Sequence, residues 1–220
     1  MNQSKIAFTA FILLACLFIV STGCNPNPST TGKATDSSQG DFSEFTDALF
    51  IPDIGLPETP QSYQEEGGSL AFQYPSDWKI TETEPGGLVT LQGPTENVAM
   101  TISKGKYVKK MEKMSKFEFR EANNKKMDGS AVYNSYDKGM LNDLYCISTE
   151  FTAYLNNPSD PGVFEVENRM FIFFYKDQVY SVVFDGLVMM EGKRFDDFSQ
   201  ALGGMNAIIN SIRFSEETPE

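Results

Sequence analysis

The sequence predicts an α+β fold in which helices flank an antiparallel sheet. Strand-like segments occur in two groups along the chain, and a helical pattern follows each group. Residues 170–175 are apolar at both alternating positions, as expected of a central strand covered on both faces. Residues 195–212 place their apolar side chains on one face of a helix. Helices on the two faces of a sheet form a sandwich around it.

The first 23 residues have the pattern of a signal peptide. Lys5 supplies a positive charge near the start, and residues 6–20 form an uncharged apolar run. About 15 apolar residues suit the apolar core of a signal peptide, whereas a membrane-spanning helix needs ~20. Residues 1–23 are therefore expected to direct the chain out of the cytoplasm.

The residues before Cys24 resemble the lipobox of bacterial lipoproteins, in which the cysteine becomes the lipidated N-terminus. Thr22 and Gly23 fit that pattern, and Ser21 stands where the family usually has leucine. Cys16 is a rival lipidation site, but cleavage there would truncate the apolar run. An uncleaved anchor and ordinary secretion are further alternatives. The lipobox implies lipidation at Cys24 and a location on the extracytoplasmic face of a bacterial cell membrane or envelope.

Residues 24–62 are predicted to be a disordered tether between this anchor and a folded domain at 63–214. Its polar, Pro- and Gly-rich composition buries too little apolar surface to offset the entropy of ordering. Flexible-chain scaling gives its first part, from residue 25 to about residue 47, a mean reach of about 25–30 Å. An apolar patch at 48–56 interrupts the tether. We expect the patch to pack along the domain, and the alternative is a strip that binds a partner.

The domain is predicted to be organised around an aromatic turn that contains Trp78, the only tryptophan. Tyr74 precedes Pro75 and is therefore biased toward extended backbone, and Pro75 sets the φ angle of the first turn position. We expect one strand to end at Tyr74 and the next to begin at Trp78, whose ring anchors the pair in the core. Alternation and turn residues place the first strands at 69–74, 78–83, 88–92 and 97–103.

A charged segment follows, and it is predicted to form an amphipathic helix over residues 109–127. Its apolar face would consist of residues that recur at every third position, namely Val108, Met111, Met114 and Phe117. The second strand group is predicted at 131–136, 143–154, 170–175 and 179–184, with a loop at 156–162.

The closing helix at 195–212 is expected to begin beside Asp196 and Asp197, whose charges oppose the positive end of the helix dipole. Gly203 and Gly204 fall in its middle, where each glycine costs roughly 1 kcal/mol relative to alanine. We therefore expect close backbone approach or a kink at this pair. Residues 215–220 form a polar tail.

The order of elements and two short motifs resemble the PsbP-like superfamily. The motifs are Phe72-x-Tyr74-Pro75-x-x-Trp78 and Asn210-Ser211-Ile212-Arg213-Phe214. The superfamily includes the extrinsic photosystem II subunit PsbP, DcrB-like envelope lipoproteins and a eukaryotic Ran-binding relative. The resemblance covers about residues 63–214 and implies an α/β/α sandwich. The metal-binding histidines proposed for the photosynthetic member have no counterpart, because this chain has no histidine.

The composition argues against several kinds of chemistry. Without histidine the chain lacks the commonest general base and a leading zinc ligand. Its net charge of −12 disfavours nucleic acid as a partner. Phosphate-loop, dinucleotide, calcium-loop and Gly-x-Ser-x-Gly motifs are absent from the sequence. Cys146, among apolar residues, is expected to be a buried, unreactive thiol. We therefore expect no catalytic activity, no cofactor and no metal.

A basic segment at residues 104–126 stands out in this acidic chain. It holds nine basic and three acidic residues, a net charge of +6. The plain interpretation is a solvated helix face that neighbouring acids balance. The functional interpretation is contact with an anionic membrane surface, to which the tether would hold the segment close. The candidate contact residues are Lys109, Lys110, Lys113 and Lys116.

Together these features predict a lipid-anchored, extracytoplasmic binding or accessory protein. It would contact the membrane through lipidated Cys24 and bind an unidentified envelope protein. Two other classes stay open. A small-molecule-binding lipoprotein would need a sizeable apolar pocket between sheet and helix, and an envelope enzyme would need carboxylates or other polar groups that converge in a cleft.

Overall fold

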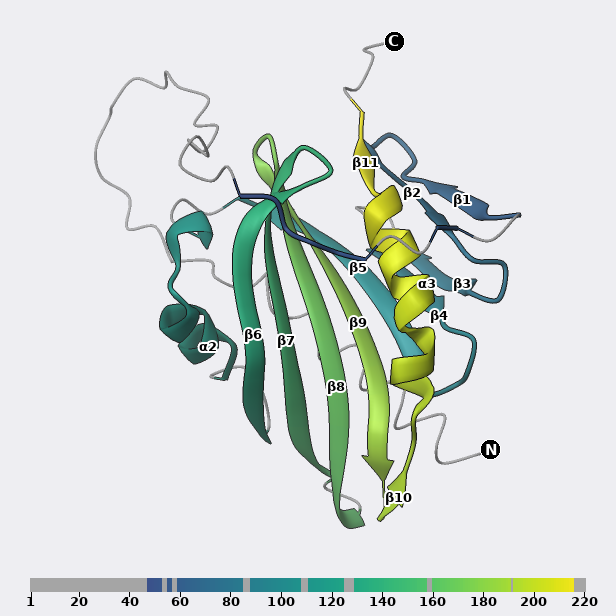
Figure 1. The fold of residues 1–220 in the computed structure, drawn as a ribbon, viewed down its shortest axis with the longest axis vertical. Coiled ribbons are helices and arrows are strands. Elements are labelled where there is room, and N and C mark those ends of the chain that lie inside the picture. Colours follow the sequence, from purple (N-terminus) through teal and green to yellow (C-terminus); the bar gives the residue numbers. More distant parts are fainter. Residues whose placement is uncertain are drawn as a thin grey trace.

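Two antiparallel sheets and two α-helices make up the described part of the chain (Figure 1). The computed structural model describes residues 47–52, 55–56, 59–84, 88–107, 111–124, 129–157, 160–190 and 192–215. The small sheet contains β1 Gln61–Gln64, β2 Leu70–Tyr74 and β11 Arg213–Phe214. The large sheet contains β3 Lys79–Glu84, β4 Leu88–Gln92, β5 Val98–Lys106, β6 Gly129–Leu141, β7 Leu144–Asn157, β8 Asp160–Tyr175, β9 Gln178–Met190 and β10 Lys193–Arg194. The helical elements are the 3-10 turn η1 Met111–Lys113 and the helices α2 Lys116–Asn124 and α3 Asp197–Ser211.

The strands of the large sheet follow the order β3-β4-β5-β9-β8-β7-β6, with β10 paired to β9, and those of the small sheet the order β1-β2-β11. Every pairing between these strands is antiparallel, which confirms the predicted sheet type. Two hairpins turn through residues with positive φ, which are Asn142 and Asp143 between β6 and β7, and Lys176 between β8 and β9. Asn and Asp tolerate this left-handed backbone better than most residues do.

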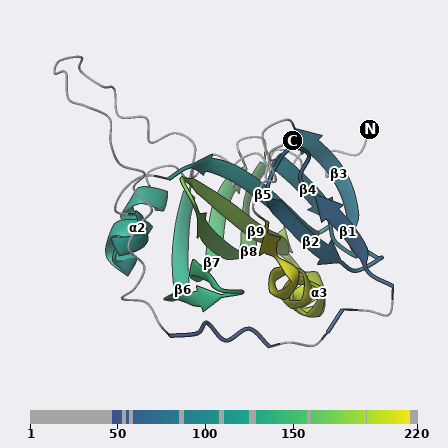
Figure 2. The same cartoon turned by 90° about the horizontal axis from the view of Figure 1, so that it is seen from above.

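The two faces of the large sheet are covered differently (Figures 1 and 2). On one face, α3 and strand β2 of the small sheet pack side by side against β4, β5, β8 and β9. On the other face, Phe119 of α2 packs in a second apolar cluster with residues of β6 to β9. The predicted α/β/α sandwich is therefore matched only loosely, because a small sheet shares one face with α3 and α2 lies beside the edge strand β6.

Strand β8 is buried on both faces, as its sequence predicts. Phe171 and Phe173 belong to the cluster under α3, whereas Ile172 and Phe174 belong to the cluster on the opposite face. The predicted hairpin with β9 is also confirmed, since Tyr175 pairs with Gln178. Its central position explains the pattern, because a strand with both faces covered needs apolar side chains at every position.

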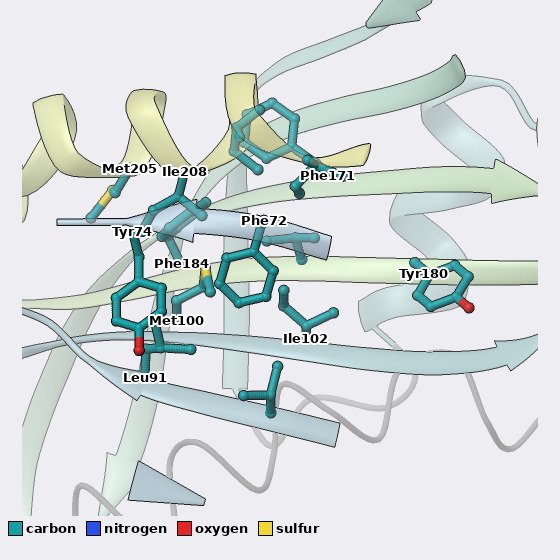
Figure 3. Packing of buried hydrophobic residues seen from close by; sticks show 14 of the residues in the cluster. Phe72, Tyr74, Leu91, Met100, Ile102, Phe171, Tyr180, Phe184, Met205 and Ile208 are labelled. Atoms are coloured by element: carbon teal, nitrogen blue, oxygen red, sulfur yellow. The ribbon is translucent and has the colours of Figure 1, made fainter. Parts of the chain in front are cut away.

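The aromatic turn around Trp78 is present, but it connects the two sheets. Strand β2 ends at Tyr74, and the Trp78 backbone N–H donates to the Pro75 carbonyl oxygen at 3.0 Å. Strands β2 and β3 belong to different sheets, so the expected pairing between them is wrong. Trp78 is 1% exposed and its ring meets that of Phe184 edge-on, with centroids 6.0 Å apart. Figure 3 shows the surrounding core, to which β2, β4, β5, β8, β9 and α3 contribute.

Helix α3 approaches the Trp78 turn through one of its two central glycines. A Cβ atom at Gly204 would lie 2.7 Å from Trp78 Nε1, so the predicted close approach is confirmed at this residue. The α3 face that includes Phe198, Met205 and Ile208 is buried as predicted. Phe195 is an exception, because it precedes α3 and packs in the cluster on the opposite face of the sheet.

Several predicted boundaries are wrong. The helix expected at 109–127 is divided into η1 and the nine-residue helix α2. Phe117, expected on its apolar face, is 70% exposed. Strands β6 to β9 extend well beyond their apolar segments, and β7 and β8 continue into the loop expected at 156–162 up to Asn157 and from Asp160. Pairing to long neighbours supports polar strand residues that pattern alone assigns to loops.

Candidate functional site

The structure describes only some of the predicted site residues. Cys24, Lys109 and Lys110 lie outside the described residues, so their assignments stay predictions. Lys113 ends η1 and Lys116 begins α2, and both side chains are exposed. The candidate site is therefore built from two described segments that bear on these assignments, namely residues 111–124 and the first described residues, which begin at Asp47.

Helix α2 begins where it does because of a capping box. The Ser115 side-chain oxygen accepts from the Glu118 backbone N–H at 3.2 Å, and the Glu118 carboxylate accepts from the Ser115 backbone N–H at 2.8 Å. These bonds satisfy two N–H groups that the first helical turn would leave unpaired. The hydrogen bond from the Ser115 backbone also lowers the pKa of the Glu118 carboxyl. The signal Ser115-x-x-Glu118 was available in the sequence, and the every-third-residue pattern obscured it.

The 3-10 turn η1 is held against the sheet by polar contacts at Glu112. The Tyr107 hydroxyl donates to the Glu112 carboxylate at 2.7 Å, and Lys138 Nζ and the Tyr145 hydroxyl each donate to the Glu112 backbone carbonyl at 2.9 Å. Burial lowers the pKa of Lys138 and raises the pKa of Tyr145. Glu112 is thus a buried structural acceptor, whereas the neighbouring Lys113 faces solvent.

One lysine counted in the basic segment belongs to another part of the structure. Lys104 lies in β5 and its Nζ is 2.9 Å from a Glu65 carboxylate oxygen. The Tyr180 hydroxyl donates to the other Glu65 oxygen at 3.3 Å, and the Leu70 backbone N–H donates to the same oxygen at 3.3 Å. Burial opposes the charge on Lys104, but hydrogen bonds to Glu65 and Tyr180 raise its pKa overall. This network joins β5 and β9 of the large sheet to the segment between β1 and β2 of the small sheet.

The first described residues, 47–52 and 55–56, belong to a segment that we call the strap. The Leu49 backbone N–H donates to the Met140 carbonyl at 2.9 Å, and the Met140 N–H donates to the Asp47 carbonyl at 2.8 Å. Ala48 forms an isolated parallel bridge with Met140 of β6, and Ile51 is 8% exposed within the core under α3. The described part of the apolar patch at 48–56 therefore packs along the domain, as expected, and ordered contacts begin before the predicted domain start at residue 63.

Strand β6 joins the strap to the basic segment. The strap is bonded at Met140 and lies so close to Gly139 that a methyl group there would overlap the Asp47 carbonyl oxygen. The adjacent residue, Lys138, holds η1 through its bond to the Glu112 carbonyl. Figure 2 shows α2 and the start of the strap beside β6, at the end of the large sheet that is remote from β3. Asp47, the first described residue, thus contacts the same strand that holds η1.

Two hollows lie along α3 on either side of the strap. One, of about 660 Å³, is bordered by Tyr63, Asn210 and Arg213, and the other, of about 470 Å³, is bordered by Trp78 and Gly204. Gly55 of the strap borders both. Their volumes are within the usual range for small-molecule pockets, about 300–1,000 Å³. A small-molecule-binding lipoprotein would need its pocket between α3 and the large sheet. Core side chains fill that interface, and the two hollows lie outside it.

A buried acid, Asp185, lies on the face of β9 opposite α3. It is 6% exposed, and its Oδ2 has no hydrogen-bond partner among the described residues. Burial raises the pKa of this carboxyl to about 7. Asn168 of β8 is its cross-strand neighbour, and its amide group donates to the Val166 carbonyl at 2.9 Å. Nothing in the local sequence distinguishes Asp185 from a solvent-facing strand residue, so sequence reasoning missed it.

Three further observations bear on chemistry. Cys146 is fully buried as expected, and burial raises the pKa of its thiol. Within the described ranges, no three Asp, Glu, His or Cys side chains come together in a way that could hold a metal ion. No helix in this part of the chain has the length and apolar character needed to cross a membrane.

Comparisons with known proteins agree on the fold. No protein-family model matches the chain, and no curated protein matches it. The Ran-binding protein Mog1p of Saccharomyces cerevisiae shares the fold with a TM-score of 0.51 and 7% identity, over 70% of this chain and 95% of Mog1p. The superfamily that the sequence motifs resemble has a eukaryotic Ran-binding member. The likeness to Mog1p therefore supports the predicted PsbP-like fold. At 7% identity it carries nothing about function.

Two other solved structures are similar at lower scores. The cyanobacterial PsbP of Synechocystis sp. PCC 6803 gives a TM-score of 0.47 and 11% identity, over 76% of this chain and 98% of its own. A protein from Bacteroides thetaiotaomicron gives 0.44 and 13%, over 72% of this chain and 50% of its own. The chain thus spans about half the length of the Bacteroides protein.

Proposed function

We propose that this chain is a lipid-anchored, extracytoplasmic binding or accessory protein of a bacterial cell membrane or envelope, without catalytic activity. Lipidated Cys24 would hold it at the membrane, and an envelope protein would be its partner. Support for the anchor comes from the lipobox-like Thr22-Gly23-Cys24 and the polar segment that follows it.

The observation that carries the proposal is the strap. Because Ile51 is in the core and Leu49 is bonded to β6, the tether is joined firmly to one end of the sheet. If the segment from Cys24 to Asp47 is the flexible tether that its composition predicts, its mean reach is about 25–30 Å. A lipid on Cys24 would therefore hold the β6 end of the domain at a mean distance of this order from the membrane. An anchor at this end leaves β3 and the small sheet directed away from the lipid, toward a partner.

The basic segment would then face the membrane. Lys113, Lys116 and Arg120 are exposed beside β6, and with Lys109 and Lys110 they are the groups we assign to anionic headgroups. Each basic residue near an anionic surface contributes about 1 kcal/mol, and the attraction falls off within a Debye length of ~8 Å at physiological salt. An attraction of this size would hold a free protein only weakly. A tether keeps the basic residues at a high effective concentration near the membrane, so the same attraction can orient the domain.

Fatty-acid labelling in cells tests the anchor directly. The wild-type protein should incorporate labelled fatty acid, and Cys24→Ser should abolish this labelling. Cys16→Ser is the matched control and should leave labelling unchanged. Labelling that persists in Cys24→Ser and is lost in Cys16→Ser would overturn the assignment. Crosslinking of the wild-type protein in intact membranes would then identify the partner protein.

A further inference from the structure

We propose that the hollow of about 660 Å³ beside the small sheet binds a small organic acid, and that Arg213 holds the carboxylate of this ligand. The site is separate from the membrane contact proposed above, and it does not depend on lipidation of Cys24. Figure 1 shows β1, β2 and β11 beside the end of α3, and residues of these elements and of the strap border the hollow.

The pairing of the small sheet places Gln64, Ala71 and Arg213 in one row across its three strands. Gln64 pairs with Ala71, and Ala71 pairs with Arg213. Directly paired residues share a face of the sheet. This face is the outer one, because the next residue of β2, Phe72, is buried in the core under α3. Strands lie about 4.8 Å apart, so the backbones of Gln64 and Arg213 are separated by roughly 10 Å. The short side chain of Ala71 between them leaves room for a ligand.

Arg213 is held in place by backbone groups, and part of its guanidinium is left free. Its Nη1 donates to the Asn210 carbonyl at 2.8 Å and to the Ile212 carbonyl at 2.6 Å. Among the described residues, Nε and Nη2 form no hydrogen bond and no ion pair. These two atoms carry three of the five N–H groups of the planar fork, and the fork can bind both oxygens of a carboxylate. A side chain that is already fixed loses less entropy on binding, so Arg213 is preorganised for this contact.

The charge along the border of the hollow also favours an acid. Arg213 is the only charged side chain among the described residues that border it, although the chain has a net charge of −12. The second hollow along α3 has the opposite character, because Asp77 is the only charged residue among its described border residues. One guanidinium matches the single charge of a carboxylate. A phosphate group carries up to about two charges and is matched less well.

Neutral polar groups complete the border and indicate what else the ligand carries. Ser62 and Gln73 are paired across β1 and β2, and their side chains form no hydrogen bond among the described residues. Asn210 also borders the hollow, and its Nδ2 has no partner in this part of the chain. Hydroxyl and amide groups donate and accept hydrogen bonds. We therefore expect a carboxylic acid that has hydroxyl or N-acyl groups of its own.

Arg213 has a structural role as well, which does not require a ligand. A cation near the C-terminal end of a helix is stabilising, and Arg213 bonds a carbonyl at the end of α3. This role uses Nη1 and leaves the Nε–Nη2 edge and the adjacent hollow unexplained. Lysine separates the two roles, because it keeps the charge and lacks the planar fork.

A nuclear magnetic resonance titration with matched pairs of small molecules tests the inference. The protein is the chain from residue 24 with Cys24→Ser, which retains every described residue. The probes are glucuronate and N-acetylglycine, and the controls are glucuronamide and N-acetylglycinamide, in which a neutral amide replaces the carboxylate. Each acid should shift the backbone amide signals of residues 62–64, 71–73 and 210–213, with dissociation constants of about 1–10 mM for ligands this small. Each amide should bind roughly 10-fold more weakly, and signals around Lys193, an exposed cation on β10, should not shift.

Variants of the border residues assign the binding to this site. Arg213→Gln should weaken binding of both acids roughly 10-fold or more, and Arg213→Lys roughly 3- to 10-fold. Ala71→Leu should weaken it by filling the space beside Arg213, and Asp77→Asn, the matched control at the second hollow, should leave it unchanged. Far-ultraviolet circular dichroism checks the fold of each variant.

Three results would overturn the inference. They are the absence of saturable shifts near Arg213 with both acids, equal binding of the acids and their amides, and wild-type binding by Arg213→Lys. Fatty-acid labelling of Cys24 is independent of all three, so the anchor and this site stand or fall separately.

Discussion

On the α3 side of the large sheet, Trp78 is enclosed by Phe184 and Gly204 in a core that excludes solvent, whereas at the β6 end α2 and the strap leave Phe50 and Phe117 in solvent. The first region is held by apolar burial, which scales with area and is not directional. The second is held by a few hydrogen bonds around β6 and by two buried apolar side chains, Phe119 and Ile51. We therefore expect most of the stability to come from the α3 side, and the β6 end carries the membrane contact that we propose.

The largest expected effect is at the α3 side. Trp78→Ala should lower the free energy of unfolding by about 3–5 kcal/mol, because it leaves a cavity in the packed core. Native tryptophan emission in the wild type should be blue-shifted and should move to the red on unfolding. Chemical denaturation monitored by circular dichroism measures the loss. Stability close to wild type, together with solvent-like native emission, would contradict the account of this region.

The next effect concerns Asp185 and depends on pH. Burial raises the folded-state pKa of this carboxyl to about 7, above the ordinary value of 3.8, so the folded state binds its proton more tightly. The stability that this proton contributes is present below pH ~4, falls as the pH rises toward 7, and is lost above it. Asp185→Asn, which stays neutral, should be more stable than wild type at pH 8 by up to about 4 kcal/mol.

Unfolding measured from pH 4 to pH 8 tests this prediction. The difference between Asp185→Asn and wild type should grow with pH across that range. Burial also raises the pKa of Glu167, but that group is present in both proteins and cancels in the comparison. A difference that is constant with pH would show that Asp185 is ionised in the folded protein throughout.

A smaller, local effect is expected at the β6 end. Gly139→Ala places a methyl group against the Asp47 carbonyl oxygen, so the strap must move away from β6. Overpacking of this kind costs about 1–3 kcal/mol. Limited proteolysis should cleave the strap faster in the variant while the core stays protected. If cleavage within residues 47–56 is as slow as in wild type, contacts other than the hydrogen bonds of Asp47 and Leu49 to Met140 hold the strap.

The smallest effect is expected at the start of α2. Ser115→Ala removes the side-chain half of the capping box and should cost about 1 kcal/mol. Hydrogen exchange should quicken at the amides of α2 and not at those of β8. Lys116→Ala, a change at an exposed position beside it, is the control and should leave exchange in α2 nearly unaltered. Faster exchange throughout the large sheet would mean that α2 is not an independently held segment.

The same two regions explain which features were predictable from sequence. Residues 170–175 are apolar at every position, which predicts a strand without a solvent face. Gly204 predicts a close approach, because glycine is otherwise unfavourable in a helix. The division of β2 and β3 between two sheets carries no such signal, because short alternating strands look alike in either sheet. The pKa of Asp185 depends on what packs over it, which local sequence does not record.

At the β6 end, the prediction of one helix over residues 109–127 is wrong for a specific reason. Residues 108–117 repeat apolar side chains every third position, which matches a 3-10 turn better than an α-helix of 3.6 residues per turn. Phe117 thus looked like a core residue, whereas Ser115 and Glu118 cap a new helix that turns it outward. Of the predicted site residues, Lys113 and Lys116 are exposed as a surface contact requires, and Cys24, Lys109 and Lys110 stay predictions.

The distance of position 117 from a bilayer tests the proposed orientation most directly. Nitroxide labels at Phe117→Cys, next to Lys116, and, as control, at Ile80→Cys are compared in the chain with a histidine tag in place of residues 1–24, in which Cys146 is buried and does not take the label. The tag binds nickel-chelating lipids in phosphatidylglycerol-containing vesicles, and the account predicts that this headgroup nickel relaxes the label at 117 faster than the label at 80. Equal relaxation at both positions would contradict it.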